Sequence, residues 1–163
     1  METTGTTGGE ALREVMRHYP TGVTVITTLV PGTGPVGLTA TSFTSVSLDP
    51  PLILACIDLT SSSHDRLTLA ENFCVNILSS GQVDLAERFS TVPGETRFEG
   101  VPWHASTSGC PVLEGAVAWM ECSTEQVHPA GDHSIVLGRV LETSVQGGAP
   151  LTFYRGSFGS VGP

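Results

Sequence analysis

Short runs of β-branched and apolar residues recur along the chain, and each run ends at a turn containing glycine or proline. Residues 22–30 alternate in a strand-like way, a Pro-Gly-Thr-Gly-Pro turn follows at 31–35, and residues 36–41 resume the pattern, which predicts a β-hairpin. Further strand-like runs lie at 52–57, 73–78, 116–127, 134–144 and 151–154. Closely spaced strands with few helices favour a mostly β fold with short helices, an antiparallel barrel rather than a doubly wound parallel sheet.

Helical spacing is confined to short segments. Apolar residues recur every three or four positions between Glu10 and Tyr19, and Pro20 ends that pattern. Two shorter helices are expected over about 64–70 and 83–89, because a polar, hydroxyl-rich turn precedes each of them.

The remaining segments are expected to be irregular. The hydroxyl-rich stretch 42–49 and the turn-rich segment 90–111 both interrupt the strand pattern. A chain of 163 residues is long enough to bury one core. We therefore expect one domain over residues 11–163, preceded by a flexible polar tail over residues 1–10.

The charge balance excludes several partners. Seven arginines and no lysine stand against sixteen acids, which gives a formal net charge of −9. The arginines do not cluster in the sequence, so nucleic acid and anionic membrane surfaces are not expected partners. The chain has no apolar run long enough to span a bilayer and no signal-peptide pattern at its N-terminus, so we expect a cytoplasmic protein.

Cysteine and histidine spacing gives no metal motif. The four cysteines form no Cys-x-x-Cys pair, and in a cytoplasmic chain they are expected to be reduced core thiols. The five histidines form no His-x-His or His-Glu-x-x-His pattern, so we expect no metal site. The chain also lacks the Gly-x-Ser-x-Gly sequence that many hydrolases place around their nucleophile.

One motif imitates a dinucleotide-binding fingerprint. Gly32, Gly34 and Gly37 match Gly-x-Gly-x-x-Gly, and Asp58 follows about twenty residues later. In the true motif the last glycine opens a helix whose N-terminus binds the pyrophosphate. Here β-branched and hydroxyl residues follow Gly37, so we interpret the segment as a hairpin turn.

Hydroxyl residues gather where buried strands end. Residues 39–47 contain six serines and threonines, residues 60–63 contain four more, and Ser79-Ser80 follows another strand. Helix capping and turn chemistry explain such clusters in many proteins. If the three turns converge at one rim, their hydroxyl and backbone N–H groups are suited to bind a phosphate without lysine.

Two isolated polar residues add to this interpretation. Asn76 lies within an apolar strand, and a buried amide needs hydrogen-bond partners that a ligand edge is able to supply. His133 follows Gly131-Asp132 at a strand start, where it is either a ligand donor or an ordinary turn residue. With no hydrolytic machinery in the sequence, the chemistry is expected to belong to a cofactor.

The sequence resembles the short-chain flavin reductases, the reductase components of two-component monooxygenases. The resemblance begins with Gly37-Leu-Thr-Ala-Thr-Ser-Phe-Thr-Ser-Val-Ser-Leu-Asp-Pro-Pro-Leu52. It continues in order through Phe73-Cys-Val-Asn-Ile-Leu-Ser79, Gln82-x-x-Leu-Ala-x-Arg-Phe89, Arg97-Phe-x-Gly-Val-x-Trp103, Gly131-Asp-His133 and Pro150-Leu-x-Phe-Tyr-Arg155. It covers about residues 11–158.

This resemblance implies a split β-barrel, a Greek-key-like antiparallel barrel that binds FMN or FAD, and a homodimer with the flavin near the subunit interface. It implies hydride transfer from NADH or NADPH and delivery of reduced flavin to a partner monooxygenase, with His133 beside the nicotinamide. The flavin-binding residues that it implies are Thr39, Ala40, Thr41, Ser42, Ser45, Val46, Ser47, Cys56, Ile57, Asp58, Ser62, Ser63, Asn76, Ser79, Gln82, Arg88, Phe89, Tyr154 and Arg155.

Two departures from the family pattern leave the choice between FMN and FAD open. The chain has no lysine, so any cationic phosphate contact must come from arginine, and the second hydroxyl turn has Ser61-Ser-Ser63 where Ser-x-Thr is frequent. Two other functions also remain open: a flavin carrier without nicotinamide turnover, and a flavoenzyme that keeps its flavin to reduce an organic substrate.

Overall fold

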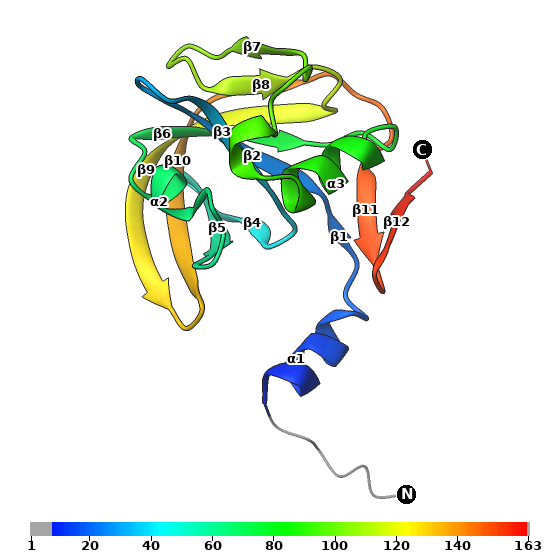
Figure 1. Ribbon diagram of the computed structural model, residues 1–163. Coiled ribbons are helices and arrows are strands. Elements are labelled where there is room, and N and C mark those ends of the chain that lie inside the picture. The colour runs from blue at the N-terminus through cyan, green and yellow to red at the C-terminus, as the bar shows by residue number, and fades with distance from the viewer. Residues whose placement is uncertain (1–7, 163) are drawn as a thin grey trace, which may run out of the picture.

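A curled antiparallel sheet of seven strands forms the centre of the computed structural model, which describes residues 8–162 (Figure 1). The strands are β2 (Thr24–Val30), β3 (Gly34–Ala40), β4 (Phe43–Leu48), β5 (Pro51–Asp58), β6 (Asn72–Ile77), β9 (Ala118–Ala130) and β10 (His133–Val145). Their order across the sheet is β3-β2-β6-β9-β10-β5-β4.

The sheet curls into a barrel around one apolar cluster. Alternate residues of β5 point inward, so Ile53, Ala55 and Ile57 are buried while the residues between them are partly exposed. They join Phe73 and Val75 of β6 in a cluster that also draws residues from β2, β3, β9 and β10. Because β3 and β5 meet in this core without pairing in the sheet, the fold is the expected split barrel.

A second cluster covers the outside of β2 and β6. Val25 and Leu78 pack there against Phe89 of α3 (Val83–Thr91). Leu151 joins them from β11 (Leu151–Tyr154), which pairs with β1 (Thr21–Gly22) and β12 (Ser157–Ser160) in a small sheet. These contacts fix the C-terminal hairpin beside the barrel, as Figure 1 shows at the right of the view.

Two parts of the sequence that were expected to be irregular contain strands. The stretch 42–49 forms β4, an edge strand with exposed hydroxyls and a bulge between Ser45 and Ser47. The segment 90–111 contains β7 (Trp103–Ala105), and β8 (Pro111–Leu113) begins at its end. β12 was also missed. All four are short or lie at an edge, so they lack the alternating burial that identifies a strand in a sequence.

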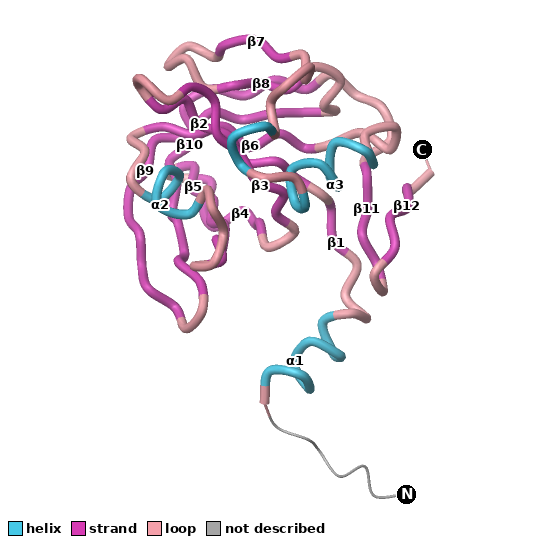
Figure 2. Tube along the Cα trace, in the orientation of Figure 1, coloured by secondary structure: helices cyan, strands magenta, loops and turns pink. Residues whose placement is uncertain are grey.

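The helices are short, and they lie around the barrel (Figure 2). They are α1 (Gly9–Met16), α2 (His64–Thr68), α3 and the 3-10 turn η1 (Gly94–Thr96). α1 contains no buried residue and extends away from the barrel. The tail expected over residues 1–10 lies mostly outside the described residues, and its last two residues belong to α1.

The Gly-x-Gly-x-x-Gly segment is a hairpin turn, as the sequence indicated. Gly32, in the connection from β2 to β3, has a φ angle of 76°, Gly34 at the start of β3 has one of 106°, and Gly37 lies within β3. No helix within residues 8–162 is long and apolar enough to cross a membrane.

Candidate functional site

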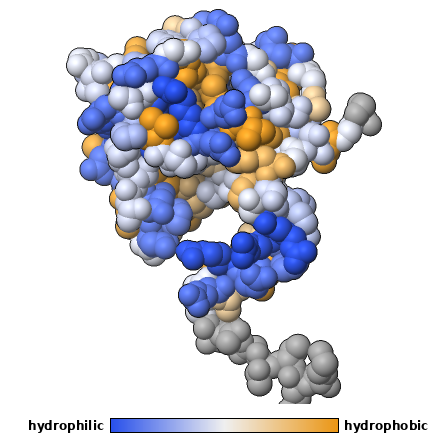
Figure 3. Space-filling model, turned by 45° about the vertical axis from the view of Figure 1, so that its right-hand side comes forward, coloured by the Kyte–Doolittle hydropathy of each residue, from blue (hydrophilic) through white to orange (hydrophobic). Residues whose placement is uncertain are grey.

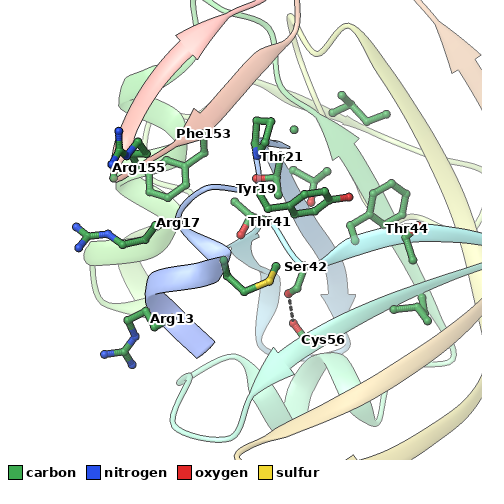
Figure 4. Close-up of a pocket in the computed structure, with 18 residues that line it drawn as sticks. Arg13, Arg17, Tyr19, Thr21, Thr41, Ser42, Thr44, Cys56, Phe153 and Arg155 are labelled. Carbon is green, nitrogen blue, oxygen red and sulfur yellow. Dashed lines mark hydrogen bonds between the residues drawn. The ribbon is translucent and has the colours of Figure 1, made fainter. Parts of the chain in front are cut away.

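A pocket of about 770 Å³ opens between α1, the barrel and the turn that joins β11 to β12 (Figure 4). Its walls come from the end of α1, from β1, from β4 and β5, and from the β11–β12 turn. The volume lies within the range of small-molecule sites. Figure 3 shows, on one face of the molecule, apolar residues reaching the surface among polar ones.

Residues with hydroxyl side chains form one wall of this pocket. Thr41 and Ser42 connect β3 to β4, and Ser42 makes two hydrogen bonds with Cys56 of β5. Ser42 Oγ donates to the Cys56 carbonyl at 3.0 Å, and the Cys56 N–H donates to the Ser42 carbonyl at 3.0 Å. This reciprocal pairing holds the turn rigidly at the pocket wall.

Three arginines line the opposite side. Arg13 and Arg17 come from α1 and the residue after it, and Arg155 comes from the β11–β12 turn; all three lie on one side in Figure 4. The sequence showed no cluster of arginines, but folding brings three of the seven together. In a chain with a net charge of −9 this rim is suited to an anionic ligand group.

The turn that carries Arg155 is docked onto the end of α1. The Arg155 N–H donates to the Arg17 carbonyl at 3.2 Å, and its Nη2 donates to His18 Nε2 at 3.2 Å. Arg155 has a φ of 51°, a left-handed conformation that is uncommon for residues other than glycine. Gly156 also has a positive φ, of 82°, and a two-residue hairpin turn of type I′ needs positive φ at both central residues, so the tight β11–β12 turn accounts for this conformation.

Between these polar sides the pocket is apolar and aromatic. Leu54, Phe43 and Phe153 line it, and the ring of Tyr19 lies above Thr41 and Ser42 in the view of Figure 4. The pocket therefore combines flat apolar walls for a planar ring, hydroxyls for its polar edge and cations for an anionic tail.

The outward face of β5 continues from this pocket to His133. Cys56 is paired with Ile135 of β10, and Asp58 is paired with His133. Directly opposed residues share a face of the sheet, and two residues span about 7 Å along a strand. His133 is part-exposed, and its Nδ1 is 2.7 Å from Asp132 Oδ1. Hydrogen bonds from Thr60, and then the charge of His133, lower the pKa of Asp58.

Comparison with known proteins decides the family. The profile of the flavin reductase-like domain matches residues 16–162. The chain belongs to this family. It is 46% identical over 148 residues to the stachydrine N-demethylase reductase subunit Stc3 of Rhizobium meliloti, which covers 91% of this chain and 64% of that protein. The chain spans 47% of the length of another relative from the same organism.

Two further relatives carry nicotinamide and flavin in their names. The FMN reductase (NADH) SmoA of Agrobacterium fabrum is 40% identical over 155 residues, covering 93% of this chain and 87% of that protein. The Streptomyces globisporus NADH:FAD oxidoreductase SgcE6, solved in complex with NAD and FAD fragments, is 38% identical with a TM-score of 0.87. That likeness covers 94% of this chain and 93% of the solved chain.

Within this flavin reductase-like domain, the structure brings some of the expected flavin-binding residues together. Thr41, Ser42, Cys56 and Arg155 line the pocket, and Asp58 lies on the same outward face. Tyr154 precedes Arg155 in the same turn and is 43% exposed, with Arg155 Cζ 6.0 Å from its ring centre. Their contact with a flavin stays a prediction.

Asn76 does not reach the pocket. It is fully buried, and its Oδ1 accepts from the Leu113 N–H at 2.8 Å while its Nδ2 donates to the Val25 carbonyl at 3.1 Å and to Thr27 Oγ1 at 3.2 Å. Peptide groups of β2 and β8 therefore supply the partners that the sequence interpretation assigned to a ligand. Asn76 holds β8 against the outer face of β6.

Ser63 and Thr39 also bond to protein groups. Ser63 is 1% exposed, and its Oγ donates to the Gly37 carbonyl at 3.2 Å and accepts from Arg97 Nη1 at 3.1 Å. Thr39 Oγ1 donates to the Ala86 carbonyl at 2.7 Å, which links β3 to α3. Sequence reasoning had not singled out Arg97, which is 7% exposed and also donates to the Gly37 carbonyl.

Arg88 and the residues near it organise loops. Arg88 donates to the carbonyls of Thr96, Arg97 and Glu99, so it anchors the loop that follows α3. Gln82 accepts from the Ser79 N–H at 2.9 Å and donates to the Glu114 carbonyl at 2.8 Å.

The remaining expected residues lie elsewhere. Phe89, Ala40 and Ile57 are buried in the core. Ser45, Val46 and Ser47 lie on β4 beyond the pocket lining, and Ser62 lies against Gly94 of η1.

The residues that sequence reasoning missed are the two arginines of α1 and the aromatic residues of the pocket. Arg13, Arg17 and Tyr19 belong to or follow the helix that the sequence predicted, but nothing local shows that this helix meets Arg155. Phe153 was quoted only as part of a motif. The sequence offered one signal for them. The apolar face of the helix has no apolar partner nearby in the sequence, which indicates that the helix packs against a distant part of the chain or another copy.

Proposed function

We propose that the chain is an NAD(P)H:flavin oxidoreductase that reduces FMN or FAD with NADH or NADPH. Membership of the flavin reductase-like domain family supports this function, and the observation that carries it is the composition of the pocket. Its aromatic and apolar walls fit a planar isoalloxazine, its hydroxyl side fits the polar ring edge, and its arginine rim fits a phosphate. A bound flavin supplies the acceptor for the nicotinamide hydride.

The residues around the pocket bind and orient rather than react. Ser42 and Cys56 hold a rigid turn against which a ring edge is positioned, and this positioning supplies much of the rate enhancement of a bimolecular transfer. Arg155 would bind the ligand phosphate through charge-assisted hydrogen bonds, and Arg17, whose Nη1 lies 3.6 Å from Glu14 Oε2, would add positive charge beside it.

His133 is proposed to border the nicotinamide. It shares the outward face of β5 and β10 with Cys56, and its imidazole is accessible at the strand start. An imidazole N–H is a suitable donor to a carboxamide oxygen. Its role is therefore binding and orientation, not proton transfer to a substrate.

The reduced flavin is proposed to leave for a partner monooxygenase. Stc3, a relative, is named as the reductase subunit of a demethylase, which supports this use. A pocket open to the surface, rather than a closed cavity, is compatible with release of the flavin. A cytoplasmic location would give the enzyme access to reduced nicotinamides.

We also propose that a second copy of the chain covers α1 and forms a homodimer. α1 is eight residues long and buries none of them, and helices this short are marginal in water without packing. Leu12 and Val15 on α1 are 64% and 67% exposed, and Leu48 on β4 is 92% exposed. Arg13 and Met16 of α1 line the pocket, so a second copy packed on this helix would complete its walls.

Steady-state oxidation of NADH and NADPH by the purified chain, with added FMN, FAD or riboflavin, tests the activity. We expect the rate of turnover to saturate as flavin is added. The rates with NADH and NADPH then show which nicotinamide the enzyme prefers. A chain that binds flavin, as shown by fluorescence quenching, but oxidises neither nicotinamide would be a carrier. Turnover only with a flavin that stays bound, and with an added organic acceptor, would indicate a flavoenzyme that keeps its cofactor.

Light scattering coupled to gel filtration tests the dimer. We expect twice the chain mass for the native protein and a monomer for the variant Leu12→Asp/Val15→Asp. A control, Leu69→Asp, places one acidic side chain at an apolar residue that is 83% exposed and lies outside the pocket lining, and it should leave the dimer intact. A native monomer would contradict the proposal.

A further inference from the structure

Two cysteines lie together outside the barrel, away from the pocket described above. Cys74 and Cys110 form a small buried cluster with Val112 and Trp119, and the two thiols are 0% and 2% exposed. Cys74 belongs to β6, where its neighbours Phe73 and Val75 point into the barrel. The side chain of Cys74 therefore points to the opposite face, beneath the β7–β8 ribbon.

Both cysteines are held by rigid elements. Asn76 follows Cys74 by two residues on the same face of β6, and it accepts from the Leu113 N–H at 2.8 Å and donates to the Pro111 carbonyl at 3.4 Å. These bonds fix β8 over β6 at the residue directly after Cys110. The Cys110 carbonyl accepts from the Ser106 N–H at 2.9 Å, which fixes the turn before it.

The surroundings of the two thiols make them unequal. A hydrogen bond from the Cys74 thiol lowers the pKa of Cys110, and the same contact, together with burial, raises the pKa of Cys74. Ser108 Oγ lies 3.5 Å from Cys110 Sγ and favours the thiolate further. The Glu121 carboxylate, bonded to the Ser108 N–H at 3.0 Å, opposes both ionisations. Cys110 is thus the more nucleophilic sulfur of the pair.

A second pocket leads to Cys110. It has a volume of about 490 Å³ and is lined by Ser108 and Cys110 together with residues of β2, α2 and the start of β6. The other two cysteines have different surroundings. Cys56 lines the first pocket, and burial in the barrel raises the pKa of Cys122 to about 12. Cys110 is therefore the only cysteine of the described chain that combines a thiol neighbour with access from a pocket.

We propose that Cys74 and Cys110 are a redox modification site that forms an internal disulfide when hydrogen peroxide enters the second pocket. The Cys110 sulfur attacks one peroxide oxygen, the O–O bond breaks, and one water leaves after the thiol proton is transferred. The Cys74 sulfur then attacks the resulting sulfenic acid, an S–S bond forms and the S–O bond breaks. The second water carries away the Cys74 proton, so two thiols and one peroxide give one disulfide and two waters.

Mass spectrometry of the full chain tests this site. The protein is treated with peroxide, its remaining thiols are blocked with N-ethylmaleimide in denaturant, and the intact mass and peptides are measured. We expect two of the four thiols to escape blocking, one cross-linked peptide joining Cys74 to Cys110, and full reversal by dithiothreitol. A second copy is not needed, so the cross-link remains within one chain at high dilution.

Variants separate the two steps. Cys74→Ser should abolish the cross-link and leave a sulfenic acid at Cys110 that dimedone traps, whereas Cys110→Ser should abolish both products. Cys56→Ser serves as the matched control and should keep the cross-link. Four blocked thiols in the peroxide-treated wild-type chain, or oxidation confined to Cys56, would overturn the proposal. The measurement on the wild-type chain does not depend on whether any variant folds.

Discussion

His133 on β10 lies directly opposite Asp58 on β5, so both side chains extend from the face of the sheet that carries Cys56. This pairing connects the Gly-Asp-His turn to the pocket, although about seventy-five residues separate Asp58 from His133 in the sequence. The sequence left His133 open between a ligand donor and a turn residue, and this pairing supports the proposal that it borders a ligand bound at the pocket wall.

Substituting His133 by alanine should weaken nicotinamide binding. Loss of one hydrogen bond to a neutral ligand group corresponds to about a tenfold rise in the KM for the nicotinamide. The Kd for flavin should stay within about twofold, because His133 lies beyond the pocket lining. Initial rates and fluorescence titrations measure the two constants. An unchanged KM would remove His133 from the site.

Arg155→Gln should discriminate between flavins with and without a phosphate. A charge-assisted hydrogen bond contributes about 1.5–3 kcal/mol, so FMN affinity should fall by about 10- to 100-fold. Riboflavin, which has no phosphate, should bind equally to both proteins. Arg139→Gln is the matched control, because Arg139 pairs with Glu125 away from the pocket. Equal losses for both flavins would show that the arginine acts on the fold.

Asn76→Leu should destabilise the fold without changing the flavin site. It leaves the buried Leu113 N–H without its partner, and the expected loss is about 2–4 kcal/mol of unfolding free energy. Urea unfolding measures the loss. Flavin affinity of the folded fraction, measured without denaturant, should match that of the native protein. A stable variant with weak flavin binding would restore the ligand-edge interpretation of Asn76.

Gly138→Ala should overpack the barrel. A Cβ at Gly138 would lie 2.5 Å from Phe73 Cζ and 3.1 Å from Cys122 Cβ, so the core must shift. We expect a loss of about 1–3 kcal/mol of unfolding free energy by chemical denaturation. At Gly81, an added Cβ meets no atom within 4 Å, so Gly81→Ala should change stability by less than about 0.5 kcal/mol. Equal effects of the two variants would contradict this packing argument.

The carboxyl of Asp58 should titrate below its usual value of 3.8, because the Thr60 N–H and hydroxyl both donate to its ionised form. The carboxylate is therefore fully formed above the unfolded pKa, and its stabilising effect is lost as the pH falls through the lower folded pKa. NMR titration of the side-chain carbon measures the value. Thr60→Ala removes the hydroxyl bond and should move the pKa upward, while an unshifted pKa would assign the effect to the backbone N–H alone.

The sequence predicted the barrel strands well because each is a run of β-branched and apolar residues bounded by turn residues. β5 alternates between buried and partly exposed residues, whereas β2 and β6 are buried along most of their length. β2, β3, β5, β6, β9 and β10 all lie where the pattern indicated, within a few residues. β4 was missed because its serines and threonines face outward on an edge strand. β4 pairs with β5 because β5 follows it directly in the chain, and the residue pattern of β4 itself does not indicate this pairing.

The site was predicted less completely, for a physical reason. Thr41, Ser42 and Cys56 lie in one pocket because β3 and β5 are joined through the β4 hairpin, which the sequence motif spans. The meeting of Arg17 with Arg155 depends on how α1 docks on the C-terminal hairpin, and no local spacing encodes that contact. The partners of Asn76 likewise come from a distant segment.

Alternate residues of β5 face two separate environments. Ile53, Ala55 and Ile57 fill the barrel, while Leu54 and Cys56 line the pocket. Packing limits the first set to a narrow range of volumes, whereas the second set is limited only by the ligand. Relatives are thus able to diverge in ligand preference by exchanging every second residue of this strand while the scaffold persists. The same alternation makes the outward positions a natural place to begin directed evolution of a new acceptor preference.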